Sequence, residues 1–140
     1  MGSGLNVGNV MNRKVVIIDA NKSIKEAAKL MAKHNIGSVI VVEKDRAKGI
    51  ITERDIVRKI VAEERSMDTK CSDIMSHPLV VITPDASIEA AARIMRDSSV
   101  KKLPVIEKDG TLVGIITEDD IMKLFPSIVD LLELKRDIEI

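Results

Sequence analysis

A Thr-x-x-Asp segment occurs twice in the 140-residue sequence, each time directly after Gly-Ile-Ile. It places Thr52 and Asp55 in the first half of the chain, and Thr117 and Asp120 in the second. If a helix begins after each threonine, the aspartate stands in its first turn, where free backbone N–H groups favour anions. A short carboxylate that faces a cleft there is suited to binding a vicinal diol, because each of its oxygens can accept one hydroxyl.

The same segment also has a purely structural interpretation. Threonine is a preferred N-cap residue, and an acid three residues later can complete a reciprocal cap with the backbone. A capping box usually has Glu or Gln at that place, whereas both copies here have Asp. The sequence alone therefore leaves a helix cap and a diol-binding site open as alternatives.

The other reactive side chains do not form a catalytic set. Neither His34 nor His77 has a Cys, Asp or Ser partner at a nucleophilic or metal-ligand spacing. Cys71 stands near an expected helix start, where a thiolate could be mildly favoured, but a buried and inert cysteine is the preferred interpretation. The sequence contains no Gly-x-Gly-x-x-Gly and no Walker-type phosphate loop. We therefore do not expect an enzyme or a metal site.

Composition narrows the possible partners. The 22 basic and 22 acidic residues cancel, so no net field attracts nucleic acid or an anionic membrane. Phe125 is the only aromatic residue, which leaves almost no platform for stacking bases. No apolar run reaches the roughly 18 residues of a membrane span, and a single cysteine suits a reducing compartment. We expect a cytoplasmic protein that binds neither nucleic acid nor membrane.

The Thr-x-x-Asp segments belong to an internal repeat. Many residues recur 64 positions later, and after a one-residue slip the Gly-Ile-Ile-Thr-x-x-Asp segment recurs as well. Asn-Val-Met at residues 9–11 is echoed by Asp-Ile-Met at 73–75. The apolar positions have the spacing of one helical face in each copy. These matched positions are Ser23, Ile24, Ala27, Ala28 and Met31, and Ser87, Ile88, Ala91, Ala92 and Met95.

Each copy predicts a βαββα unit. Ser23 or Ser87 caps the first helix, with Glu26 completing a capping box in the first copy only. The last helix begins at the threonine of the Thr-x-x-Asp segment. Asp109-Gly110 is a strong hairpin signal, and Asp45-Arg46 a weaker one. The expected strands are 15–18, 39–43 and 49–52, and 80–82, 103–107 and 112–117.

These elements predict an α+β protein in which two repeats pack about a pseudo-two-fold axis. Residues 39–42 are apolar throughout, so both faces of the sheet should be covered. The remaining apolar helix faces are expected to meet a second pair in a disc-shaped homodimer. The expected parts are a flexible N-terminus at 1–8, repeats at 9–62 and 71–125, a linker at 63–70, and a tail at 126–140 with a helix over 127–134.

The order Val-Met, Ser-Ile-x-x-Ala, Leu-Pro-Val and Gly-Ile-Ile-Thr-x-x-Asp resembles the CBS-domain family, named after cystathionine β-synthase. The resemblance covers both repeats, about residues 9–125. It implies a regulatory module whose two clefts bind AMP, ADP, ATP or S-adenosylmethionine and which signals to a separate effector protein. The alternative is a dimerisation or scaffold module whose clefts no longer bind ligand.

The resemblance also assigns residues to a first cleft. There the adenine would lie between aliphatic groups, because aromatic side chains are almost absent. A solvated edge-strand pair remains the alternative for the two lysines, and core packing for Ile36. The residues carried over are Thr117, Asp119 and Asp120 at the ribose, Lys101 and Lys102 at the phosphate, and Ile36 and Gly37 at the base.

The second cleft is expected to differ from the first. Its ribose residues would be Thr52 and Asp55, and Thr83 and Val100 would lie near the base, Val100 with core packing as its alternative. The residues equivalent to the two lysines are Gly37 and Ser38, so a phosphate would need another cation such as Arg54. The resemblance therefore implies two unequal clefts, of which the second favours a less charged ligand such as S-adenosylmethionine or adenosine.

Overall fold

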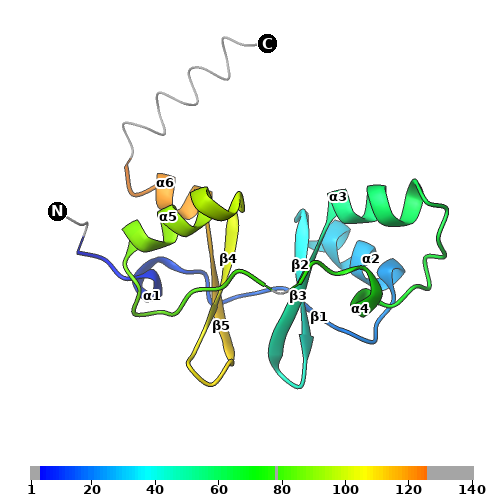
Figure 1. The fold of residues 1–140 in the computed structure, drawn as a ribbon, viewed down its shortest axis with the longest axis horizontal. Helices are drawn as coiled ribbons and strands as arrows, with labels where there is room; N and C mark the ends of the chain where they lie inside the picture. The colour runs from blue at the N-terminus through cyan, green and yellow to red at the C-terminus, as the bar shows by residue number, and fades with distance from the viewer. Residues whose placement is uncertain (1–3, 78, 126–140) are drawn as a thin grey trace, which may run out of the picture.

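The computed structural model describes residues 4–77 and 79–125 and contains two α+β units that lie side by side (Figure 1). The first unit comprises β1 (Ile17–Asp19), α2 (Ile24–His34), β2 (Ser38–Glu43), β3 (Arg46–Thr52) and α3 (Glu53–Asp55), which continues into a π-helical segment (Ile56–Val61). The second comprises α5 (Ile88–Ser98), β4 (Lys102–Ile106), β5 (Leu112–Thr117) and α6 (Glu118–Met122). A short helix precedes each unit, α1 (Val7–Val10) and α4 (Cys71–Ile74).

The two sheets differ by one strand. In the first unit β1 runs parallel to β2, and β3 pairs antiparallel with β2 on its other side. In the second unit the strand expected at 80–82 is reduced to a single bridge between Ile82 and Val105. The first-unit bond from the Ile40 N–H to the Val16 carbonyl has no counterpart, because Pro104 stands at the equivalent position without an N–H. The expectation of a full strand there was wrong.

The hairpin turns follow their local sequences. In the β2–β3 turn the two central residues are Lys44 and Asp45, with φ angles of 53° and 65°. The turn therefore lies one residue earlier than Asp45-Arg46, because the left-handed pair of a two-residue hairpin falls on Lys44-Asp45. In the β4–β5 turn Gly110 has a φ of 92°, as the Asp109-Gly110 signal predicted.

The first helix of each unit begins as predicted. The Ser23 and Ser87 hydroxyls accept the N–H groups of Glu26 (3.2 Å) and Ala90 (3.0 Å). The return bond that would complete a capping box at Glu26 is not among the hydrogen bonds of the described residues. The helices bury the predicted face, which is narrower than expected because Ala92 is exposed. Its buried members are Ile24, Ala27 and Met31 in α2, and Ile88, Ala91 and Met95 in α5.

The short leading helices are exchanged between the units. Helix α1 donates the Val7 N–H to the Ala86 carbonyl (2.8 Å), and Val7 is buried in the core of the second unit. Helix α4 donates the Cys71 N–H to the Lys22 carbonyl (2.8 Å), and Cys71 and Ile74 lie in the core of the first. These reciprocal contacts give the pair its pseudo-two-fold relation. At the end of the segment 1–8, which was expected to be flexible, Val7 is instead part of a core.

The exchange explains why methionine and glycine recur in the repeat. Met11 follows α1 and packs on Gly114 of β5, where an added Cβ would lie 2.6 Å from the Met11 Sδ. Met75 follows α4 and packs on Gly49 of β3, where the corresponding distance to the Met75 Sδ is also 2.6 Å. Glycine at these two places therefore lets the leading segment of one repeat approach the last strand of the other.

The expected linker is held against the first unit. The Ile24 N–H donates to the Thr69 carbonyl (2.9 Å) and the Lys25 N–H to the Met67 carbonyl (3.0 Å). The tail at 126–140, including the helix expected over 127–134, lies outside the described residues. Among the residues that are described, no helix is long and apolar enough to cross a membrane.

Candidate functional site

Both Thr-x-x-Asp segments form reciprocal helix caps. The Thr52 N–H donates to Asp55 Oδ2 (3.0 Å), and the Asp55 N–H donates to Thr52 Oγ1 (3.1 Å). Thr117 and Asp120 make the same two bonds at 2.9 and 3.1 Å. The structural interpretation of the motif is thus confirmed, but each cap uses only one oxygen of its carboxylate. The second oxygen, Oδ1, is left to contact another group.

Four other predicted site residues lie at the strand starts, beside these caps. The Glu53 N–H donates to the Gly37 carbonyl (2.9 Å), and the Glu118 N–H donates to the Lys101 carbonyl (2.8 Å). In the sheets, Ser38 is paired with Thr52 and Lys102 with Thr117. The lysine pair therefore lies beside the Thr117–Asp120 cap, and Gly37 and Ser38 lie beside the Thr52–Asp55 cap.

The two groups meet where the repeats adjoin. The Lys102 Nζ donates to the Ser38 Oγ at 2.9 Å, and these two residues occupy equivalent positions in the repeats. Ser38 is buried, Lys102 is half-buried and Lys101 is exposed. This hydrogen bond joins the two repeats. It places the Lys102 ammonium of the second repeat at the edge of the first.

The remaining predicted residues are more dispersed. Ile36 and Val100 are half-buried and pack against the cores of their own units. Arg54 and Asp119 are exposed in the first turns of α3 and α6. Thr83 donates its hydroxyl to Asp85 Oδ1 (2.6 Å) in an open hollow of about 570 Å³ that is also lined by Glu107, Lys108 and Asp109. No hydrogen bond or ion pair among the described residues joins Thr83 to the Thr52–Asp55 cap.

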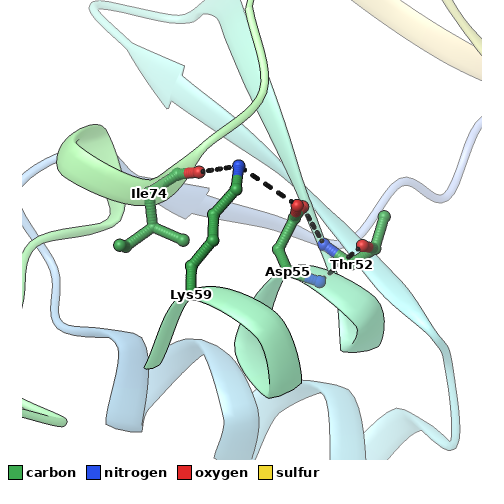
Figure 2. Close-up of polar contacts among 4 residues, drawn as sticks. All are labelled: Thr52, Asp55, Lys59 and Ile74. Carbon is green, nitrogen blue, oxygen red and sulfur yellow. Dashed lines mark hydrogen bonds and ion pairs between the residues drawn. The ribbon is translucent and has the colours of Figure 1, made fainter. Parts of the chain in front are cut away.

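Lys59 contacts the site but was not among the residues predicted from the sequence. Its Nζ lies 3.3 Å from Asp55 Oδ1 and donates to the Ile74 carbonyl at 3.0 Å, as Figure 2 shows. The sequence contained a signal for this ion pair, because Asp55 and Lys59 are one helical turn apart. The equivalent residue of the second repeat is Leu124, so this contact is not repeated.

Cys71 is not a reactive thiol in the folded protein. Its side chain is buried, and burial together with the nearby Glu26 carboxylate raises the pKa of the thiol to about 11. The Sγ donates to the Ser23 carbonyl at 3.6 Å. The alternative of a favoured thiolate at a helix start was therefore wrong, and the cysteine is a core residue. No group of His, Cys, Asp and Glu among the described residues could hold a metal ion.

The Cys71 thiol should make the fold sensitive to alkali. The raised pKa means that the unfolded chain ionises first, so stability is fully present below about pH 9 and is lost as the pH rises to about 11. The loss should be on the order of 2 kcal/mol. Urea unfolding followed by circular dichroism between pH 8 and 11 measures it. Cys71→Ala is the control, and an equal decline in that variant would assign the effect to other groups.

The sequence matches the CBS domain over residues 7–62 and 71–127. The CBS domain-containing protein YhcV of Bacillus subtilis is 36% identical over 82% of this chain and 81% of its own length. The CBS domain pair of protein MJ0100, solved with 5′-methylthioadenosine and S-adenosylmethionine, is 28% identical and superposes with a TM-score of 0.77 over 87% of this chain and 96% of its own. The CBS domain protein PAE2072 from Pyrobaculum aerophilum, solved with AMP, is 26% identical and has a TM-score of 0.75 over 83% and 89% of the two chains. This chain therefore belongs to the CBS-domain family.

Proposed function

We propose that this CBS-domain pair is a regulatory module rather than an enzyme. It binds adenine nucleotides or S-adenosylmethionine between its repeats and signals to a separate effector protein. The observation that carries the proposal is the contact between Lys102 and Ser38, which brings the lysine pair, the strand starts and the Thr-x-x-Asp caps to the junction of the repeats. Two structural neighbours hold adenosine derivatives, one of them AMP.

The first site of the proposal lies at the Thr117–Asp120 cap. Asp120 Oδ2 accepts the Thr117 N–H, which leaves Oδ1 to accept a ribose hydroxyl. Lys101 is exposed next to the start of this helix and can attract a phosphate. Charge-assisted hydrogen bonds of this kind are shorter and stronger than neutral ones. The first site is therefore suited to AMP, ADP or ATP.

The second site of the proposal lies at the Thr52–Asp55 cap and has a different charge. Gly37 and Ser38 stand where the first site has its lysine pair. The ammonium of Lys102 is bonded to Ser38 and that of Lys59 is paired with Asp55, which leaves Arg54 as the exposed cation in the first turn of α3. A ligand with little or no negative charge suits this site better. Protein MJ0100 was solved with 5′-methylthioadenosine and S-adenosylmethionine, neither of which contains a phosphate.

A homodimer is part of the same proposal. Val57 and Val61 of the π-helical segment are 58% and 65% exposed and lie one helical turn apart, so their side chains share one exposed apolar face. A second copy of the pair would cover them. This observation also supports the alternative of a dimerisation module without ligand, so binding must be tested directly.

Isothermal titration calorimetry with AMP, ATP, S-adenosylmethionine and adenosine tests the proposal. The chain contains no Trp or Tyr, so heat is a better signal than intrinsic fluorescence. A ligand at 100 times its dissociation constant should also stabilise the fold by about 2.7 kcal/mol per site. We expect at least one of these compounds to bind and to raise the melting temperature. If none of these compounds binds or raises the melting temperature, the dimerisation alternative replaces the proposal.

A further inference from the structure

Asp55 and Asp120 are equivalent as helix caps but differ at their second oxygen. In the first repeat Asp55 Oδ1 lies 3.3 Å from the ammonium of Lys59. In the second repeat Asp120 forms no ion pair among the described residues. Oδ1 is the oxygen that the cap leaves available for a ribose hydroxyl. The two proposed sites are therefore unequal at the atom that should bind the ligand.

Lys59 is held at this oxygen from two sides (Figure 2). Its ammonium donates to the Ile74 carbonyl at the end of α4 (3.0 Å) while it pairs with Asp55. The side chain of Asp55 is only 13% exposed and that of Lys59 is 40% exposed. Water screens such a pair less than it screens a pair on the surface. The bond to the Ile74 carbonyl therefore helps to hold the ammonium beside the carboxylate.

The second repeat differs at the position equivalent to Lys59. Leu124 replaces the lysine and packs against the second core, together with Val10 of α1. Helix α6 ends at Met122, whereas the first repeat continues helically to Val61. An apolar side chain beyond the helix end cannot neutralise a carboxylate. The Asp120 carboxylate thus has no competing ammonium among the described residues, whereas the Asp55 carboxylate is paired with one.

We propose that Lys59 occupies the Asp55 oxygen that a ribose hydroxyl needs, and thereby makes the Thr52–Asp55 cleft the weaker of two nucleoside sites. This inference rests on the proposed function. Ligand fills the Asp120 site first, and the Asp55 site fills only when the ligand displaces Lys59. Lys59 acts as a specificity-determining residue, because a ligand must compensate for the loss of its ion pair with Asp55.

Adenosine is the right probe, because it has the diol and the base but no phosphate that Lys59 could attract. Its affinity for the second site is measured by calorimetry in an Asp120→Ala background, where the first site is weakened. Adding Lys59→Met keeps the length of the side chain and removes its charge, so binding should become roughly threefold to tenfold tighter. Arg58→Met in the same background is the matched control, because Arg58 is an exposed cation of the same helical segment. This control should leave the affinity unchanged.

The outcomes separate this inference from the proposed function. If the unaltered protein binds adenosine but Lys59→Met leaves the second site as weak as before or weaker, Lys59 does not compete with the ligand. If the unaltered protein binds none of the adenine compounds, the proposed function fails and the inference fails with it. Circular dichroism melting establishes that each variant is folded. Lys59→Gln replaces Lys59→Met if the latter does not fold.

Discussion

Replacing Ile74 by alanine is expected to lower the free energy of unfolding by about 2–5 kcal/mol. Ile74 ends the short helix α4 at the beginning of the second repeat, yet it is 2% exposed within the core of the first. The loss has two causes: the variant no longer gains the free energy of burying these methyl and methylene groups, and a cavity remains where they were. Urea unfolding followed by circular dichroism measures the change.

The same experiment shows whether the two repeats unfold as one. Because α1 fills the second core and α4 fills the first, neither repeat retains its core when the other opens. We therefore expect a single transition in both the parent and the variant. Met67→Ala is the control, since Met67 is 52% exposed and its truncation should change stability by no more than about 0.5 kcal/mol. Two separate transitions, or a loss at Ile74 no larger than that at Met67, would contradict the exchange of leading helices.

Local features of the fold could be predicted because neighbouring residues determine them. The helix starts at Ser23, Thr52, Ser87 and Thr117 follow from caps within a few residues, and all four are present. The left-handed turn at Gly110 follows from the Asp-Gly pair. The internal repeat predicted two similar units, because similar sequences favour the same local structures.

Long-range features were harder to predict. Helices α1 and α4 have four residues each, too few to show a helical period, so their exchange between cores left no local signal. The loss of the strand at 80–82 depends on Pro104, which stands in a neighbouring strand some twenty residues away. The effect of Pro104 can be predicted only when it is known that this strand would pair through the N–H that proline lacks.

The candidate site shows the same division. The caps at Asp55 and Asp120 were predicted as one of two alternatives, and the difference between Lys101-Lys102 and Gly37-Ser38 was visible in the sequence. The bond between Lys102 and Ser38 joins residues 64 positions apart, so only the packing of the repeats reveals it. Comparison of the copies could have identified Lys59, but its second contact with the Ile74 carbonyl depends on the fold.

Replacing Asp120 by alanine is expected to weaken adenine-nucleotide binding by roughly 1.5–3 kcal/mol, the scale of a hydrogen bond to a charged group. That loss corresponds to about a tenfold to 150-fold higher dissociation constant. The physical reason is that Oδ1 of Asp120 accepts a ribose hydroxyl in the proposed site while Oδ2 accepts the Thr117 N–H. Titration calorimetry of AMP onto the parent and the variant measures the effect.

The alanine variant alone cannot separate binding from capping, because it also removes the bond to the Thr117 N–H and should cost about 0.5–2 kcal/mol of stability. Asp120→Asn makes the separation. Its amide oxygen can still accept the Thr117 N–H, so the fold should keep most of its stability, but the second acceptor and the charge are gone. Asp97→Asn, at an exposed acid of α5, controls for the change in charge. If Asp120→Asn binds AMP as tightly as the parent does, the carboxylate serves only the helix, and the ribose must be held by other groups.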